Sequence, residues 1–185
     1  IVDNAEKSIL QVTKDDRKGG FVPVGEAVHQ SLENITRQAQ NHEPITGLPT
    51  GFAGLDSFTT GLQKGNLIIV AARPSMGKTA FVLNIAKNIS LSHARKTVAF
   101  FSLEMGRDEL VHRLLSSTAL IDSQRLKTGR IQGEKEWLNL SKAASVFMEA
   151  PLYIDDTPGV TVSQIRSKCR RLKAEKGLEI GRAHV

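Results

Sequence analysis

Residues 66–83 read NLIIVAARPSMGKTAFVL. The stretch 67–72 is a short, almost continuous apolar run, which is typical of a parallel strand covered on both faces. The next stretch, ARPSMGKT at 72–79, matches the phosphate-binding pattern G-x-x-x-x-G-K-[ST], with Ala72 at the position of the first glycine. The stretch therefore predicts a buried strand, a tight phosphate-binding loop and the beginning of a helix.

The residue types of this loop suit a nucleoside triphosphate. Gly77 has no Cβ, so that backbone N–H groups can approach phosphate oxygens, and Lys78 adds a cation for the β- and γ-phosphates. The Thr79 hydroxyl can ligate Mg²⁺, and the helix beginning there offers its positive end. The alternative is an ordinary strand–loop–helix corner, which the strand before and the amphipathic helix after the loop disfavour. The predicted nucleotide-binding residues of the loop are Arg73, Pro74, Ser75, Met76, Gly77, Lys78, Thr79 and Ala80.

The composition excludes several classes of protein. The 185 residues suffice for one domain of ordinary size with an appendage. No apolar run approaches the roughly 20 residues of a membrane span, and no secretory start is present. Cys169 is the single cysteine, which excludes a disulfide framework and favours a cytoplasmic location. The net charge of +6 permits a polyanionic partner without requiring one.

Strands alternate with helices along most of the chain. The expected strands are 67–72, 97–103 and 151–154, and the expected helices are 24–40, 108–120, 134–148 and one after Thr161, where Thr161 and Gln164 form a capping box. Residues 45–65 are expected to form a run of turns. The helical patterns turn Val111 and Trp137 toward the core. This alternation, without hairpin signals, predicts a parallel α/β sheet flanked by helices.

The N-terminal part of the chain is expected to be separate from that sheet. Residues 1–12 have apolar residues at helical spacing, and KDDRKGG at 14–20 is typical of a hinge. The helix over 24–40 has one isolated apolar stripe, which must be buried against something. The chain's own core and a neighbouring subunit are both open alternatives for its partner.

Two further side chains are candidates for the site. Glu104 ends the expected strand over 97–103, so it should open onto the same sheet edge as the phosphate loop, since ligands bind at the carboxyl ends of parallel strands. A carboxylate there could activate water for attack on the γ-phosphate, or it could simply be solvated or cap a helix. Arg113, on the following helix, could reach a nucleotide or be exposed.

The remaining charged residues are expected to have structural roles or to face solvent. Asp155 and Asp156 follow an apolar run and resemble the acids that hold Mg²⁺ in phosphate-loop proteins, but DTPG also predicts an Asx turn into the capped helix. We therefore expect these two acids to be structural. The basic helix at 162–176 has no aromatic residues between its charges, which favours a solvated face over a nucleic-acid contact.

Four segments, ITGLPTGFAGLD, LIIVAARPSMGKTAF, VAFFSLEM and PLYIDDTPGVTVSQIRSKCRRL, resemble in order and spacing the C-terminal motor domain of bacterial replicative DNA helicases of the DnaB type. The resemblance runs from about Val24 to Gly177 and includes the alanine at 72. It implies an incomplete RecA-like phosphate-loop NTPase fold, ATP hydrolysis with Mg²⁺, and a homohexamer assembled through residues 24–40. It also implies movement along single-stranded DNA, with a primase and a helicase loader as partners.

The same resemblance implies roles and boundaries. Lys78 and Thr79 take the phosphates and Mg²⁺, Glu104 activates water, and Arg113 contacts the nucleotide. The implied divisions are 1–20, the end of a collar domain and a hinge; 21–44, a linker helix; 45–178, the first part of the motor; and 179–185, a non-native tail that resembles a translated sequencing adapter. Because the family's next strand, with its Mg²⁺-binding Asp, does not appear in that tail, this polypeptide alone is expected to be inactive.

The alternatives are another RecA-like ATPase, such as a recombinase-like protein or a phage primase-helicase, and a nucleotide-binding assembly module that does not unwind DNA. A small-molecule kinase is disfavoured because no Arg-rich lid is present.

Overall fold

The computed structural model describes residues 23–41 and 45–183, and it divides the chain into two units between Pro44 and Ile45. In the first unit, α2 (Val24–Asn41) confirms the helix expected over 24–40. The apolar side chains of its stripe are exposed: Val24, Val28, Leu32 and Ile35. The helix and hinge expected within residues 1–20 lie outside the described residues.

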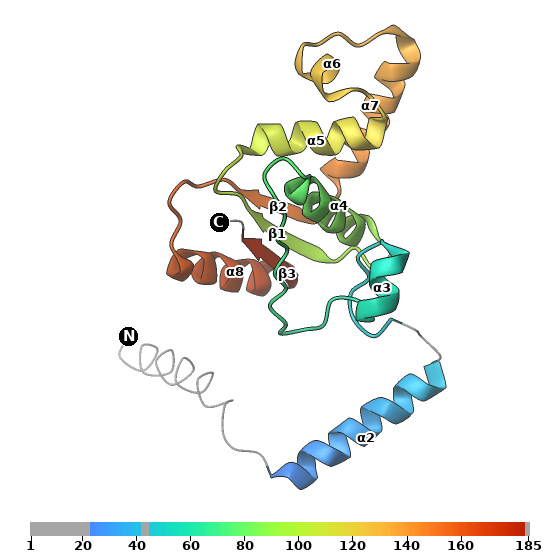
Figure 1. The fold of residues 1–185 in the computed structure, drawn as a ribbon, viewed down its shortest axis with the longest axis vertical. Coiled ribbons are helices and arrows are strands. Elements are labelled where there is room, and N and C mark those ends of the chain that lie inside the picture. Colours follow the sequence, from blue (N-terminus) through green and yellow to red (C-terminus); the bar gives the residue numbers. More distant parts are fainter. Residues whose placement is uncertain (1–22, 42–44, 184–185) are drawn as a thin grey trace, which may run out of the picture. The chain divides into compact units, whose positions relative to one another are not determined.

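The second unit is built on a three-stranded parallel sheet, seen at the centre of Figure 1. Its strands are β1 (Thr97–Phe101), β2 (Leu152–Asp155) and β3 (Leu178–Ala183), in the order β2-β1-β3. In this sheet, Val98 is in register with Leu152 on one side and with Ile180 on the other. The predicted parallel α/β sheet is confirmed, as are the strands expected at 97–103 and 151–154.

Helices cover both faces of this sheet. The chain steps from β1 to β2 through α5 (Arg107–Ala119), α6 (Ser123–Lys127) and α7 (Gly133–Met148), and it steps back across β1 to β3 through α8 (Val162–Lys176). Right-handed crossovers in opposite directions place their helices on opposite faces. Accordingly, α4 (Lys78–Leu91) and α5 share one face and α8 lies on the other (Figure 1).

The main core lies between α4, α5 and the sheet. Its most deeply buried side chains are Ile89 of α4, Phe100 of β1 and Leu110 of α5. Each such side chain contributes about 2 kcal/mol through removal of apolar surface from water. Two residues expected to face the core do not: Val111 and Trp137 are exposed. In α7 the buried position is instead Ala143, because α7 packs on a second small cluster with Ala119 and Ile121.

The prediction of a strand over 67–72 is wrong. Residues 66–73 form no ladder, and Leu67 and Ile69 are 87% and 81% exposed. An apolar run becomes a strand only when a neighbouring edge receives its N–H and C=O groups. In the described sheet both edges of β1 are occupied, by β2 and β3, and residues 66–73 pair with neither outer edge.

The C-terminal segment also differs from the expectation. Residues 178–183 form β3 beside β1, whereas 179–185 were not expected to form a strand. The pairing has an irregularity between Thr97 and Val98. Parallel pairing is made by backbone groups, so a segment without a long apolar run can occupy an open edge.

Residues 45–65 are more ordered than a run of turns. Leu48 and Leu62 form an antiparallel bridge, and the seven-residue helix α3 (Ala53–Thr59) lies between them. Buried Asp56 accepts hydrogen bonds from the N–H and the hydroxyl of Thr50, at 2.8 and 2.7 Å. The amide of Asn88 in α4 donates to the carbonyl oxygen of Thr50 at 3.0 Å. This segment therefore braces the helix that follows the phosphate loop.

Candidate nucleotide-binding site

The phosphate loop ends in a left-handed residue at the start of α4. Gly77 has φ 84° and stands at the N-cap position, and Ser75 also has a positive φ of 64°. A Cβ on Gly77 would meet no atom within 4 Å, so the positive φ, rather than crowding, is the reason for glycine there. The loop is also closed by the N–H of Met76, which donates to the carbonyl oxygen of Arg73 at 3.2 Å.

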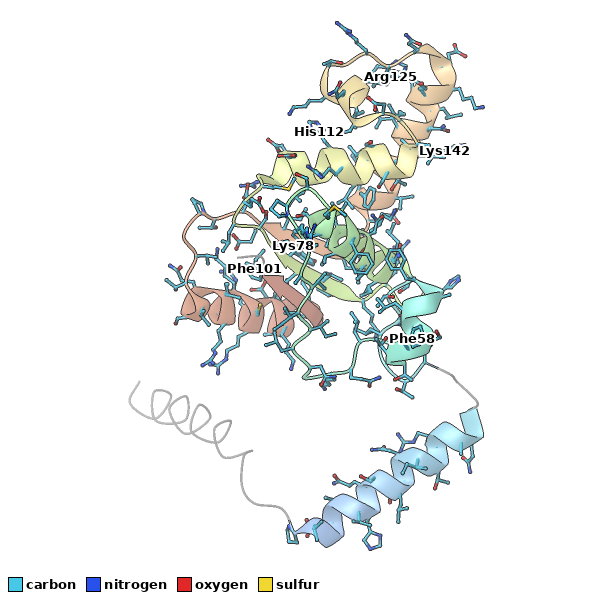
Figure 2. All side chains as sticks on the ribbon, in the orientation of Figure 1. Phe58, Lys78, Phe101, His112, Arg125 and Lys142 are labelled. Carbon is cyan, nitrogen blue, oxygen red and sulfur yellow. The ribbon has the colours of Figure 1, made fainter. Side chains whose placement is uncertain are left out.

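The N-terminus of α4 is suited to an anion. No side chain caps it, and no acidic residue lies in its first turn. The free N–H groups and the positive end of the helix dipole therefore remain available to phosphate oxygens. Lys78 and Thr79 are the first two residues of this helix, and Lys78 is labelled in Figure 2. These residues fit the triphosphate and the Mg²⁺ that the loop pattern predicts.

The chain connection places this helix end at the carboxyl edge of the sheet. A short loop, 92–96, joins the end of α4 to the start of β1, and the two elements pack together through Ile89 and Phe100. Fourteen helical residues span about 21 Å and five strand residues about 17 Å, so the two elements are nearly matched in length. Lys78 therefore lies toward the edge where β1 ends, as expected for ligand sites of parallel sheets.

Glu104 lies on the loop that leaves β1 at this edge, and this loop is fixed at both ends. The N–H of Ser102 donates to the carbonyl oxygen of Asp155 at 2.9 Å. The Ser102 hydroxyl donates to the carbonyl oxygen of Met105 at 2.7 Å and accepts from its N–H at 3.2 Å. Beyond the loop, the N–H of Arg107 donates to Asp156 at 3.0 Å. The exposed Glu104 is thus carried on an ordered turn.

Asp155 and Asp156 are engaged in structural contacts, as expected. Asp155 accepts from the N–H and the hydroxyl of Thr157, at 3.0 and 2.6 Å, which is the predicted Asx turn, and from Lys168 at 2.5 Å. Asp156 pairs with Arg107, whose backbone N–H, with its charge, lowers the pKa of that carboxyl. The capping box of Thr161 and Gln164 at the start of α8 is also confirmed.

The Asp155 contacts predict a stability effect that depends on pH. Partial burial acts to raise the pKa of Asp155, but the hydrogen bonds from Lys168 and Thr157 outweigh it and lower the pKa to about 2. A carboxyl of lowered pKa stabilises the fold above its unfolded pKa of about 4, and this contribution is lost as the pH falls through about 2. Asp155→Asn should therefore reduce the free energy of unfolding at pH 7 by about 1–2 kcal/mol, measured by urea denaturation.

The control for this experiment is Glu149→Gln, which removes one carboxylate of an exposed pair with Arg95. It should change stability by less than about 0.5 kcal/mol. The difference in unfolding free energy between Asp155→Asn and the unaltered chain should become smaller as the pH falls from 4 to 2. If Asp155→Asn and the unaltered chain had equal unfolding free energies at pH 7, the stabilising role assigned to the Asp155 contacts would be contradicted.

Arg113 is paired with a neighbouring acid on its own helix rather than held toward the phosphate loop by another element. Its guanidinium pairs with Glu109 of the same helix at 2.9 Å, and both side chains are about half exposed. An exposed pair of this kind is worth little and can exchange partners. The nucleotide contact of Arg113 stays a prediction.

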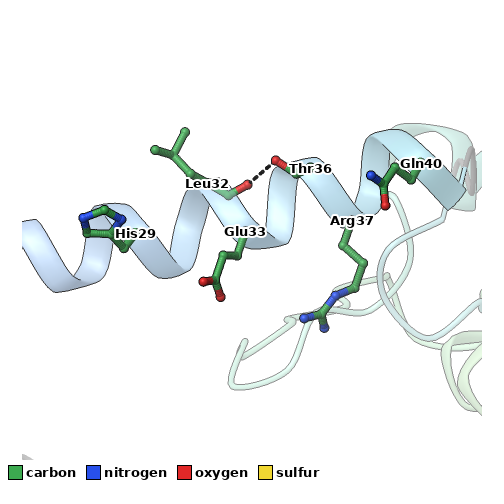
Figure 3. Close-up of a pocket in the computed structure, with 6 residues that line it drawn as sticks. All are labelled: His29, Leu32, Glu33, Thr36, Arg37 and Gln40. Carbon is green, nitrogen blue, oxygen red and sulfur yellow. Dashed lines mark hydrogen bonds between the residues drawn. The ribbon is translucent and has the colours of Figure 1, made fainter.

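Two hollows in the described part of the chain do not form a second site. A groove of about 420 Å³ runs along α2 (Figure 3), and a second of about 710 Å³ lies on α7 beside Trp137 and Leu138. Each is lined by a single helix, so neither encloses a ligand. Within residues 23–41 and 45–183, no three His, Cys, Asp or Glu side chains are grouped to hold a metal ion.

Sequence reasoning missed the parts that hold the site in place. The hydrogen bonds around Thr50 and Asp56 and the clamp between Asp156 and Arg107 join residues that are distant in sequence or lack a motif. The ring of Phe52 also packs on Phe81, one turn after Lys78, with 5.1 Å between ring centroids.

Among the described residues, no helix combines the length and apolarity that crossing a membrane requires.

The fold and the loop define a phosphate-loop α/β domain that uses a nucleotide. Residues 47–181 match the family model of the DnaB-like helicase C terminal domain, and the chain belongs to this family.

Curated relatives support the same assignment. The chain is 46% identical over 178 residues to the replicative DNA helicase DnaC of Bacillus subtilis (strain 168), and 45% identical over 178 residues to the replicative DNA helicase DnaB of Geobacillus stearothermophilus. Each alignment covers 96% of this chain and 39% of the relative. The chain therefore spans about two fifths of the length of these relatives.

Solved structures agree in fold. One solved structure, described as an ATPase domain, superposes with a TM-score of 0.78 at 36% identity, over 87% of this chain and 56% of that one. A DnaB-like replicative helicase, described with its interactions with primase, gives 0.74 at 33% identity, over 95% of this chain and 42% of that one. These matches confirm the predicted fold class, a parallel RecA-like sheet of which part is present here.

Proposed function

We propose that this chain supplies part of the motor of an ATP-dependent replicative DNA helicase. The observation that carries the proposal is the phosphate loop at the uncapped N-terminus of α4, on the carboxyl edge of a sheet whose neighbouring loop presents Glu104. Family membership supports a helicase over the alternatives, which were another RecA-like ATPase or a nucleotide-binding module without unwinding activity.

In the proposed mechanism, ATP bound with Mg²⁺ supplies the energy of phosphoryl transfer. The backbone N–H groups of the loop and Lys78 would hold the β- and γ-phosphates, and the Thr79 hydroxyl would hold the ion. Glu104 accepts a proton from the attacking water and orients it. Arg113 would leave Glu109 to contact the nucleotide. Residue type and position support the roles of Lys78, Thr79 and Glu104, whereas the role of Arg113 rests on the family resemblance alone.

The proposed partners have two kinds of support, the exposed stripe of α2 and family membership. The exposed stripe of α2 supports docking on an adjacent subunit of a homohexamer. Single-stranded DNA as the track, with primase and a helicase loader as partners, is proposed from family membership. Replication of a bacterial chromosome would place the protein in the cytoplasm. The divisions 1–20, 21–44, 45–178 and 179–185 stay predictions, including the non-native origin of the last, although residues 178–183 form β3.

The proposed function is tested with the complete gene product that contains this chain. It should unwind a forked DNA substrate in the presence of ATP and Mg²⁺, and hydrolysis should increase when single-stranded DNA is added. Hydrolysis without any unwinding or movement on DNA would favour the assembly module instead.

A further inference from the structure

The positive charge of this chain is concentrated on one helix. Six basic residues and one acidic residue lie in α8, so its 15 residues carry five of the six net positive charges of the 185-residue chain. The remaining 170 residues are nearly neutral in sum. Such a concentration creates a local potential that a uniformly distributed charge of the same size would not.

The basic side chains of α8 are presented to solvent along one face. Arg166, Arg170 and Lys173 are separated by four and three positions, so that they form one row on the helix surface, and all three are exposed. The opposite face packs on the sheet, where Lys168 pairs with Asp155. Arg171 lies on another side of the helix, where it makes a weak contact of 4.0 Å with Glu175. We call Arg166, Arg170 and Lys173 the basic row.

The position of the helix separates this row from the phosphate loop. The sheet has α4 on one face and α8 on the other (Figure 1). The capping box of Thr161 and Gln164 fixes the start of α8, and the contact of Lys168 with Asp155 attaches the helix to β2. The basic row is therefore a fixed surface outside the nucleotide site.

The composition of α8 indicates which polyanion it fits. The lack of aromatic residues, which on sequence grounds favoured a solvated face, removes any platform for stacking bases, the usual contribution to single-strand binding. It leaves contacts with phosphates open. A surface limited to phosphate contacts favours the ligand with the greatest phosphate density. Duplex DNA carries one charge per about 1.7 Å of axis, which exceeds the density along a separated strand.

We propose that the basic row of α8 binds the phosphate backbone of duplex DNA without sequence preference. The proposal goes beyond the proposed function, in which the protein moves along a single strand, and it does not depend on ATP hydrolysis. A motor domain with such a surface would hold a duplex arm of the fork while another part of the protein acts on the single strand.

The test uses the 185-residue chain itself and a fluorescein-labelled 20-base-pair duplex, with binding measured by anisotropy at several salt concentrations. The dissociation constant should lie near 10⁻⁴–10⁻⁶ M, typical of non-specific binding. The triple variant Arg166→Glu, Arg170→Glu, Lys173→Glu should bind at least tenfold more weakly. A neutral triple variant with Gln at the same positions should reduce the salt slope by about one per lost contact.

The matched control changes the same total charge elsewhere, with Lys64→Glu, Lys135→Glu and Lys142→Glu; all three lysines are exposed, and Lys142 on α7 is labelled in Figure 2. This control should retain most of the affinity, and circular dichroism should show that every variant keeps its helices. Equal loss in both triple variants would overturn the proposal in favour of net charge alone. Tighter binding of the separated strand, or equal competition by polyglutamate at the same charge concentration, would also overturn it.

Discussion

Replacing Lys78 by Ala should weaken the binding of ATP with Mg²⁺ to this chain by roughly 10–100-fold. A charge-assisted contact to phosphate contributes about 1.5–3 kcal/mol, and the substitution leaves the uncapped helix end and the loop backbone in place. Binding is measured by the fluorescence of a labelled ATP analogue, with thermal unfolding recorded for each variant.

The control for Lys78 is Lys87→Ala, which removes an equal charge from the same helix away from its N-terminus. It should bind ATP as the unaltered chain does. Unchanged affinity in Lys78→Ala, with a normal unfolding transition, would show that the loop does not bind phosphate in the proposed way.

The second large effect concerns Glu104. In the complete gene product, Glu104→Gln should leave ATP affinity within about twofold but lower kcat for hydrolysis by roughly 10²–10⁴-fold. Glutamine keeps the size of the side chain and loses the ability to accept a proton from water. The effect should therefore appear in the turnover number rather than in binding.

Glu134→Gln provides the control for Glu104, because Glu134 is an exposed acid in the first turn of α7. Its turnover should equal that of the unaltered protein. If Glu104→Gln retained more than half of the kcat, Glu104 would be only a solvated loop residue, which was the open alternative from the sequence.

The elements that sequence reasoning predicted correctly are those determined by local pattern. The helices expected over 108–120 and 134–148, the capping box at Thr161 and the Asx turn at Asp155 each depend on neighbouring residues. The carboxyl-edge position of Glu104 followed from the alternation of strands and helices, and the structure supports it.

What could not be predicted depends on pairing between distant segments. Residues 67–72 have the apolarity of a strand and no paired edge, whereas 178–183 have a paired edge without a long apolar run. Trp137 is exposed because the packing of α7 against α5 turns Ala143 inward instead. Periodicity identifies an apolar face, but tertiary packing selects which residues of that face are covered.

The central proposal is that this chain, which spans 39% of the length of the relatives above, holds the phosphate-binding part of an ATP site but does not hydrolyse ATP by itself. Its most direct test compares steady-state ATP hydrolysis by the purified 185-residue chain with that of the complete gene product. The account predicts that the chain binds ATP but shows no turnover above background, whereas the complete protein turns over and loses activity with Lys78→Ala. Steady turnover by the 185-residue chain, abolished by Lys78→Ala, would contradict the account.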